Sequence, residues 1–290
     1  MLHITDTHLH LWDLSRFRLP WLSAVPALNH DVSWQDYRAL VEQETWRIDR
    51  ALYVEVDVAP EQRGDESLFL RELCADPTNA VEGGIVSLDL QQPEAVARWL
   101  DTDAWHPAVK GVRHVLHVAS QPPGTCLSSD FIDNVNALGN AGLCFEVCLR
   151  NEELADAVVL AERTSTTLVL NHMGNVDGVC LVEDAHYAAR WRRNLQALAQ
   201  QQHVWCKVSG VNIPAGSDGD SVRPAVEQCL EIFADNRSVF ASNFPVCSLN
   251  TGLVPWVNTL IRITDGQGSA WQARFFNHNA QQLYRLTESF

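Results

Sequence analysis

The sequence predicts a (β/α)8 TIM barrel, a single α/β domain spanning residues 1–290. Short apolar runs recur along the whole chain, and each is followed by a stretch of helical period. About eight such runs are present, which is the number of strands that closes a parallel barrel. A run such as Leu168–Leu170 is apolar on both faces, as expected where helices cover one side and a packed interior fills the other.

Predicted strands and helices alternate, which indicates βα units and one parallel sheet. The strands are Ile4–His10, Ala51–Val56, Gly84–Leu88, Val109–Val115, Leu143–Leu149, Thr167–His172, Val204–Val208 and Val239–Ala241. The helices, most of which open with a residue suited to a helix start, are Ser33–Gln43, Glu61–Cys74, Pro93–Leu100, Asp130–Ala141, Glu152–Arg163, Ala185–Gln202 and Ser221–Asp235. We interpret Ser15–Asn29 as a long first loop that could act as a lid, and Asn212–Asp220 as a polar loop after the seventh strand.

Composition predicts a soluble globular protein and argues against two kinds of partner. Apolar residues make up 46% of the chain, so we expect it to be folded rather than disordered. Acidic residues outnumber basic ones by 36 to 21, so the chain lacks the excess of basic residues that nucleic-acid binding needs. The one short basic cluster is Arg190, Arg192 and Arg193, and we interpret it as a solvated helix face. No apolar run reaches the roughly 18–20 residues of a membrane span.

Cysteine usage indicates the cytoplasm. Eight cysteines are scattered without a Cys-x-x-Cys pair, and the closest two, Cys144 and Cys148, lie in an apolar, strand-like run. We therefore expect reduced, buried thiols. No basic region followed by an apolar stretch opens the sequence, so we expect no signal peptide. A homo-oligomer stays possible.

Histidines lie where several predicted strands end, and the active site of such a barrel lies at the carboxyl ends of its strands. The first strand ends in His8 and His10, which point to the same side because strand side chains alternate. The sixth ends in His172. Two imidazoles on one face can share a cation or clamp an anionic group. A lone His-x-His pair is often structural, but three histidines at the ends of separate strands indicate a site.

Charged and amide side chains accompany these histidines. Lys207 follows an apolar run and is costly to bury without a purpose, so it either binds substrate or pairs with Glu146 or Asp57. Arg113 is either a fork for a substrate carboxylate or a structural ion-pair partner. Glu55 and Glu146 are more typical of partners for such cations than of catalysts. The remaining rim residue is Asn243, at the end of the eighth strand.

The other histidines and the tryptophans receive simpler interpretations. The histidines without an expected catalytic role are His106, His114, His117 and His186. The ten tryptophans are expected to fill the core and interfaces. Trp12 and Trp21 lie near the rim and could line a pocket.

Several motifs resemble those of the amidohydrolase superfamily, most closely the amidohydrolase-related branch that holds sugar-acid lactonases and 2-pyrone-4,6-dicarboxylate lactonase. The resemblance spans nearly the full length. The motifs are Asp6–Asp13, Pro20–Leu22, Gly111–Arg113, Asn171–Gly174, Cys206–Gly210, Ser242–Val246 and the closing segment Asn279–Leu286.

The resemblance implies a barrel enzyme that hydrolyses a cyclic ester of a small carboxylate-bearing acid. In metal-using relatives the positions of His8, His10 and His172 hold a divalent ion, whereas in the pyrone lactonase branch they hold substrate without one. The position of Asn243 is usually an aspartate that activates water. An amide cannot accept a proton near pH 7, and loss of a general base costs on the order of 10²–10⁴ in rate.

Three functions follow as hypotheses. The first is a lactone hydrolase in which Arg113, Lys207, His8 and His10 bind substrate, His172 or Glu55 accepts a proton, and Asn243 orients water. The second is a metal-dependent decarboxylase of the same superfamily. The third is a binding protein that has lost the chemistry, which Asn243 favours. Because three imidazoles and an amide carry no ligand charge, we expect Zn²⁺ to be weakly bound or absent.

Overall fold

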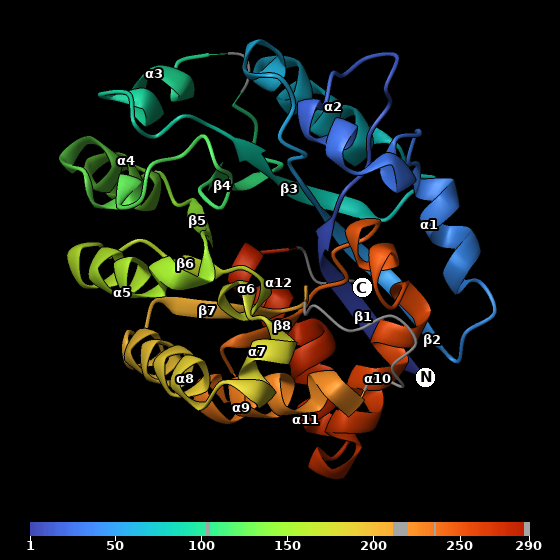
Figure 1. Cartoon of the computed structure of the whole chain (residues 1–290). Helices are drawn as coiled ribbons and strands as arrows, with labels where there is room; N and C mark the ends of the chain where they lie inside the picture. The colour runs from blue at the N-terminus through green and yellow to red at the C-terminus, as the bar shows by residue number, and fades with distance from the viewer. Residues whose placement is uncertain (103–104, 211–219, 235, 287–290) are drawn as a thin grey trace.

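A computed structural model describes residues 1–102, 105–210, 220–234 and 236–286. It contains an eight-stranded sheet whose neighbours pair in parallel in the order β1 to β8. The loop after β8 meets the end of β1, because the Leu9 backbone pairs with Phe244 and the His10 N–H donates to the Phe244 carbonyl over 2.9 Å. Figure 1 shows the strands surrounded by helices. The predicted (β/α)8 barrel is confirmed.

The strands coincide with the predicted apolar runs to within a few residues. Their bounds are β1 Leu2–Leu9, β2 Trp46–Val54, β3 Val81–Ser87, β4 Val109–Val115, β5 Cys144–Cys148, β6 Leu168–Leu170, β7 Val204–Val208 and β8 Ser238–Phe240. Only β4 and β7 have the predicted bounds at both ends.

Helices follow the strands on the outside of the barrel. The first nine are α1 Trp34–Val41, α2 Arg63–Ala75, α3 Ala95–Leu100, α4 Ser129–Asn140, α5 Leu154–Arg163, α6 His172–Asn175, α7 Gly178–Glu183, α8 Ala185–Gln200 and α9 Arg223–Phe233. After β8 come α10 Leu253–Thr264, α11 Ser269–Ala273, a π-helical segment Arg274–His278 and α12 Asn279–Tyr284. No helix among these described segments is both long and apolar enough to cross a membrane.

Side-chain caps fix where some helices begin. Ser33 and Asp36 form a capping box at the start of α1, and the Asp184 carboxylate accepts from two backbone N–H groups at the start of α8. Such caps satisfy donors that a helix leaves unpaired. Our predictions missed α10, although it buries Leu253, Trp256 and Leu260 on one face and has helical periodicity.

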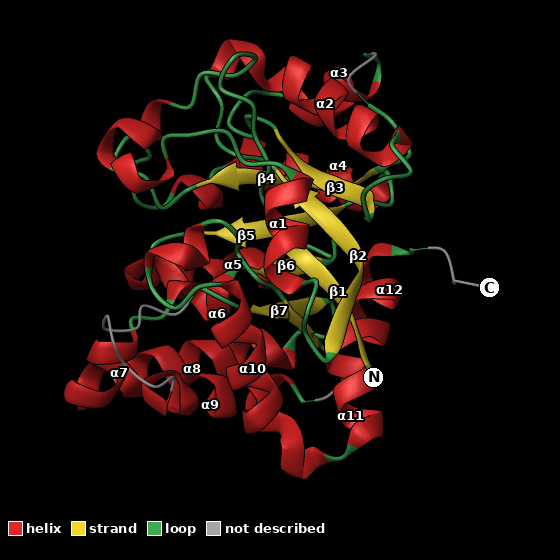
Figure 2. Cartoon of the chain, turned by 90° about the vertical axis from the view of Figure 1, so that its right-hand side faces the viewer, coloured by secondary structure: helices red, strands yellow, loops and turns green. Residues whose placement is uncertain are grey.

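Apolar side chains fill one end of the barrel interior, and polar side chains lie at the carboxyl ends of the strands. Apolar side chains from the strands, including Leu52, Val54, Ile85 and Val239, form one buried cluster with Tyr284 of α12. Figure 2 shows α12 beside the start of β1. α12 covers this end of the barrel, away from the carboxyl ends of the strands.

The first loop contributes to that open end. It contains two 3-10 turns, Pro20–Ala24 and Pro26–Leu28. The Trp21 indole donates to the Val56 carbonyl over 2.8 Å, which holds the loop against the strand-2 end. The predicted loop 212–220 falls almost entirely outside the described residues.

Candidate active site

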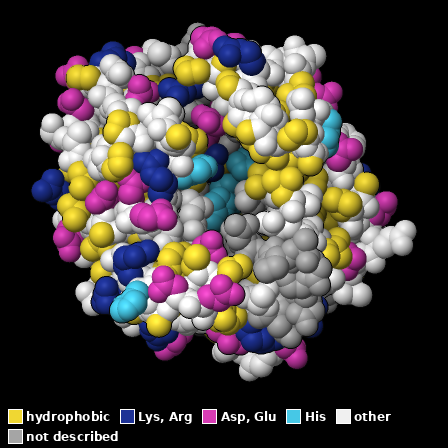
Figure 3. Space-filling model, viewed as in Figure 1, with side chains coloured by type: hydrophobic (Ala, Val, Ile, Leu, Met, Phe, Trp, Pro, Cys, Tyr) yellow, Lys and Arg dark blue, Asp and Glu magenta, His cyan; other side chains and the backbone are white. Residues whose placement is uncertain are grey.

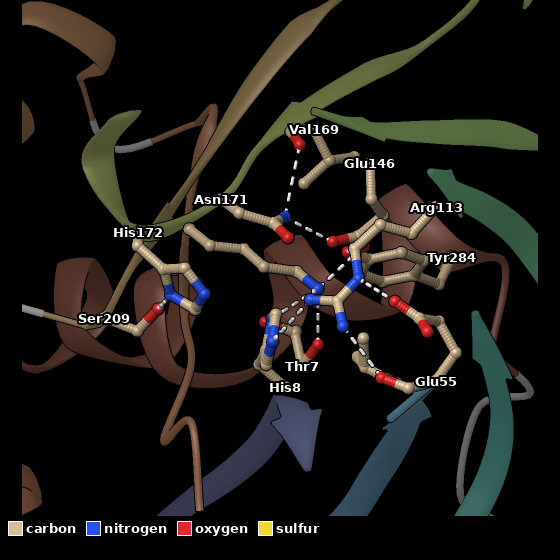
Figure 4. Close-up of polar contacts among 12 residues, drawn as sticks. Thr7, His8, Glu55, Arg113, Glu146, Val169, Asn171, His172, Ser209 and Tyr284 are labelled. Carbon is tan, nitrogen blue, oxygen red and sulfur yellow. Dashed lines mark hydrogen bonds and ion pairs between the residues drawn. The ribbon is translucent and has the colours of Figure 1, made fainter. Parts of the chain in front are cut away.

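Three imidazoles meet at the carboxyl ends of β1 and β6. The ring centroids of His8 and His10 lie 4.8 Å apart, and those of His8 and His172 lie 4.6 Å apart. Gly210 makes room for this arrangement, because it has a φ of +69° and a Cβ there would come within 2.7 Å of the His172 ring. The convergence expected from the strand ends is therefore present in the structure. Figure 4 shows His8 and His172 of this cluster.

A cavity of about 570 Å³ opens above these rings. Its polar walls include His10, Arg113, His172 and Asn243, and its apolar walls include Trp21. Figure 3 shows histidine side chains at the bottom of a hollow in this face. The volume suits a small molecule rather than a polymer.

Three predicted site residues lie beneath the cavity wall. His8, Glu55 and Lys207 are each 0% exposed, and none of them lines the cavity. The side chains that reach the cavity therefore form one layer, and these three support it from below.

Arg113 lines the cavity while it is fixed by Glu55. Its Nε donates to a Glu55 carboxylate oxygen, and its Nη2 donates to the Glu55 carbonyl over 2.8 Å. Burial disfavours the charged guanidinium, but the Glu55 carboxylate outweighs this and raises the pKa of Arg113. Arg113 is thus the ion-pair partner that one of the two interpretations expected, and its Nη1 is not engaged by Glu55.

Lys207 is ion-paired in the barrel axis. Its Nζ lies 2.7 Å from a Glu146 carboxylate oxygen and donates to the Thr7 carbonyl over 2.6 Å. Glu146 also accepts from the hydroxyl of Tyr284 over 2.7 Å and from the side-chain amide of Asn171. Burial lowers the pKa of Lys207, and Glu146 opposes that shift. The predicted alternative of a Lys207–Glu146 pair is the arrangement in the structure.

Of the imidazoles that line the cavity, those of His10 and His172 are uncharged at neutral pH. Burial, together with the nearby Arg113 charge, lowers the pKa of His10 to about 3. The same two causes lower the pKa of His172 well below its ordinary value. The His10 Nδ1 lies 2.8 Å from the Val54 carbonyl, and the His172 Nδ1 lies 2.7 Å from the Ser209 hydroxyl. Since the Val54 carbonyl is only an acceptor, His10 donates from Nδ1 and keeps Nε2 as an acceptor.

Asp6 fixes the two strand ends that carry His8 and Asn243. Its carboxylate accepts from the backbone N–H groups of His8 and Ser242 over 3.1 and 2.9 Å, and from the Tyr37 hydroxyl over 2.7 Å. The Asn243 backbone has a φ of +57°, and its N–H donates to the His8 carbonyl over 3.0 Å. This network directs the Asn243 side chain toward the cavity and toward His10, with which it hydrogen-bonds.

The structure adds residues that the sequence analysis set aside. His117 and Cys148 both line the cavity, and the Cys148 Sγ lies 3.2 Å from the His117 Nδ1. His117 was expected to have no catalytic role, and Cys148 was expected to be a plain buried thiol. Cys148 ends β5, so its place at a strand end was a signal that could have found it. Of the two rim tryptophans, Trp21 lines the cavity. Trp12 packs against Trp21, and their ring centroids lie 5.8 Å apart.

The histidines proposed as metal ligands do not offer a donor set suited to a divalent cation. The Arg113 Nη1 lies 3.4 Å from Nε2 of His8, and the Lys207 Nζ lies 3.4 Å from its Nδ1. Both ring nitrogens of His8 therefore face a cationic group, which would repel a metal ion. Among the residues that the structure describes, no group of three or more His, Cys, Asp and Glu side chains is arranged to hold a metal ion.

Comparisons with known proteins agree with this architecture. An L-fucono-1,5-lactonase of Burkholderia multivorans is 28% identical over 296 residues, which cover 98% of this chain and 96% of the relative. An uncharacterised protein of Sinorhizobium fredii is 27% identical over 302 residues and covers 98% of both chains. A zinc-bound amidohydrolase structure from Burkholderia multivorans matches with a TM-score of 0.84 at 24% identity, over 99% of this chain and 100% of that one.

The sequence profile of the amidohydrolase family matches residues 5–286, from the first strand to the segment that closes the barrel. The resemblance carried by the strand-end motifs is confirmed, and the chain belongs to the amidohydrolase family.

Proposed function

We propose that this amidohydrolase opens a lactone, or a similar cyclic ester, of a small sugar acid or dicarboxylic acid. The observation that carries the proposal is that the neutral imidazoles of His10 and His172 and the guanidinium of Arg113 line the same cavity. Such a cavity has proton acceptors for a hydrolytic step and a cation for an acid substrate. The similarity to an L-fucono-1,5-lactonase supports this choice of substrate class.

Arg113 is the residue proposed to bind a carboxylate or hydroxyl group of the substrate. Glu55 occupies its Nε and Nη2, so we propose that the ligand is met by Nη1, which also lies 3.4 Å from the His8 Nε2. A guanidinium fixed in this way loses little conformational freedom on binding, which favours affinity. His10 lines the same wall and is proposed to bind a substrate hydroxyl together with Asn243, with which its ring hydrogen-bonds.

His172 is proposed to accept a proton from the water that hydrolyses the ester. Its low pKa keeps the ring neutral, which is the form that can accept a proton at neutral pH. Asn243 lines the same cavity and is proposed to orient that water. In the overall reaction the water oxygen bonds to the carbonyl carbon, the ring carbon–oxygen bond breaks, and a hydroxy acid leaves.

Lys207, His8 and Glu55 are proposed to position the cavity residues rather than to contact substrate. Lys207 and His8 were expected to bind substrate, and Glu55 was a candidate base. All three are 0% exposed, and Glu55 is already paired with Arg113. A group in this position acts by holding the orientation of its neighbours.

We further propose that the reaction proceeds without a tightly held metal ion, because both nitrogens of His8 face cations. Elemental analysis of the purified protein is expected to find far less than one zinc per chain. One tightly held zinc per chain, retained through dialysis against a chelator, would contradict this.

The proposal is tested by ring opening of L-fucono-1,5-lactone, D-glucono-1,5-lactone and 2-pyrone-4,6-dicarboxylate, followed at constant pH by titration of the acid released. At least one of these rings is expected to open well above its spontaneous rate. Release of CO2 from an unsaturated acid, with no lactone opened, would instead identify a decarboxylase.

A binding protein without activity is the second candidate, and Asn243 is the observation that favours it. The Asn243→Asp variant separates the two. If the wild type binds sugar acids and turns over no lactone, while the variant does, the chain is a binding protein. We expect the wild type to be active and the variant to change its rate less than about tenfold, because other groups carry the proton transfer.

A further inference from the structure

A thiol and an imidazole lie together on the cavity wall, outside the three-histidine cluster. The Cys148 Sγ and the His117 Nδ1 are 3.2 Å apart, a distance that suits a hydrogen bond involving sulfur. Cys148 shares the inward face of β5 with Glu146, since side chains two apart on a strand point the same way. Cys148 and His117 both line the cavity that also contains Arg113 and His172.

The charges around this pair favour a thiolate and an imidazolium. Burial by itself raises the pKa of Cys148, but His117 and Arg113 outweigh it and the net pKa is lowered, with Glu55 opposing. The Cys148 thiolate in turn raises the pKa of His117, which Asp57 supports and Arg113 opposes. A thiolate next to an imidazolium is the reactive form of a cysteine nucleophile.

A second cysteine on the same cavity provides a contrast. Cys247 also lines the cavity, but burial and the nearby Asp6 raise its pKa to about 12. Two thiols therefore face one cavity. Of these two, Cys148 lies beside an imidazole and has a lowered pKa, whereas the pKa of Cys247 is raised.

We propose that Cys148 is the nucleophile that opens the cyclic ester and that His117 is the acid that protonates the departing oxygen. This inference rests on the proposed function, and it provides the activated nucleophile that Asn243 cannot generate. An amide cannot take a proton from water near pH 7, whereas a thiolate attacks a carbonyl without needing a base.

The chemistry balances over two steps. The Cys148 sulfur bonds to the carbonyl carbon, the ring carbon–oxygen bond breaks, and the released alkoxide takes the proton from the His117 imidazolium. This leaves a thioester and a neutral His117. Water then attacks the thioester and gives a proton to His172, and the thiolate leaves as the carboxylic acid forms. A proton passing from His172 to His117 through cavity water restores the first state.

The first test is thiol reactivity, which does not depend on a substrate. Methyl methanethiolsulfonate, a reagent small enough for the cavity, is applied between pH 5 and pH 9, and the modified peptides are identified by mass spectrometry. Cys148 is expected to react at pH 6 at least about tenfold faster than Cys247, given their different thiolate fractions. In His117→Gln this advantage should disappear. Equal reactivity of the two thiols, or no effect of His117→Gln, would overturn the proposal.

The second test is a trapped intermediate. The His172→Ala variant, mixed with the lactone that the wild type opens best and then quenched in acid, is expected to carry the mass of one acyl group on the Cys148 peptide. Hydroxylamine should remove that group, as it does from thioesters. The Cys148→Ala/His172→Ala double variant should carry none. An unmodified Cys148 peptide in an active preparation would overturn the proposal.

The third test is the rate of the single variants. Cys148→Ala is expected to lose about 10³-fold or more in kcat/KM, whereas Cys74→Ala, which changes a half-buried thiol of α2 outside the cavity lining, should stay within about threefold of the wild type. A Cys148→Ala variant as active as the wild type would refute the nucleophile and leave the lactonase standing. If the wild type opens no lactone, the proposed function fails, and the reactivity test still decides whether the pair forms a thiolate.

Discussion

At the scale of single residues, the site depends on charges that are buried in pairs. Lys207 and Glu146 are both 0% exposed in the barrel axis, and Tyr284 donates to the same carboxylate. Removing one partner of a buried pair leaves an uncompensated charge, which is far more costly than removing both. The pair therefore holds the layer beneath the cavity at a fixed place.

Lys207→Met is expected to lower the free energy of unfolding by about 3–5 kcal/mol, and Glu146→Leu by a similar amount. The double variant should lose clearly less than the two losses added together, because no charge is left unpaired. Urea unfolding of the four proteins measures this. Strictly additive losses would show that the two charges do not stabilise each other.

Residue types and strand ends predicted part of the site. The convergence of His8, His10 and His172 could be predicted because carboxyl ends of parallel strands meet at one rim. How deeply each histidine is buried could not be predicted. Alternation along a strand tells which side a side chain faces, but not which other side chains cover that histidine. His117 lies in the loop after β4, two residues beyond the strand end, so its meeting with Cys148 depends on a loop path that the sequence pattern does not determine.

At the scale of elements, the junction of β2 and α2 buries a carboxyl group behind the site. Glu66 of α2 accepts from the Tyr53 hydroxyl over 2.9 Å and from the Val56 N–H over 2.7 Å, both through Oε1. Among the described residues its Oε2 has no hydrogen-bond partner. Burial, together with the nearby Glu55 carboxylate, raises the pKa of Glu66 to about 8. The protonated form therefore joins the helix to the strand.

Glu66→Gln is expected to stabilise the protein increasingly as the pH rises. The folded chain holds the Glu66 proton more tightly than the unfolded chain, so this contribution is full below about pH 4.5 and is lost as pH rises through 8. Glutamine keeps the Oε1 acceptor and does not titrate. Between pH 6 and 9 the variant should gain roughly 3 kcal/mol on the wild type in urea unfolding. A pH-independent difference would show that Glu66 is ionised throughout.

Several elements with strong periodicity or a clear cap could be predicted, and others were missed. β4 and β7 have the predicted bounds at both ends, and turn residues mark one side of each run: Pro107 before β4 and Gly210 after β7. The predicted helix Ser33–Gln43 corresponds to α1, and its start could be predicted because Ser33 supplies the cap. After β8, the closing helix α12 falls within the segment Asn279–Leu286 that the family resemblance marks. The preceding α10 was missed although it has a clear buried face, and the segment Arg274–His278 is a π-helix, for which no simple pattern exists.

At the scale of the whole molecule, the protein buries neutral histidines that acid would charge. Burial lowers the pKa of His8, His10 and His172, and His10 reaches about 3. The unfolded chain binds these protons near pH 6.5. Stability is therefore full above about pH 6.5 and falls as the pH decreases toward 3.

As the pH falls from 7 to 5, protonation of His10 in the unfolded chain alone is expected to lower the free energy of unfolding by about 2 kcal/mol. His8 and His172 add losses of the same sign. Urea unfolding at both pH values measures the total, and a His10→Gln variant should show a shallower decline. Unchanged stability between pH 7 and 5 would mean that these rings are already protonated in the folded protein.

The central claim is that this cavity opens cyclic esters with the help of a neutral imidazole, and the most direct test is the ring-opening rate of a sugar-acid lactone in three proteins. His172→Ala is expected to lower kcat/KM by on the order of 10²–10⁴ relative to the wild type. His186→Ala, which removes an exposed histidine at the start of α8, should leave it unchanged. Equal rates for the wild type and His172→Ala would contradict the account.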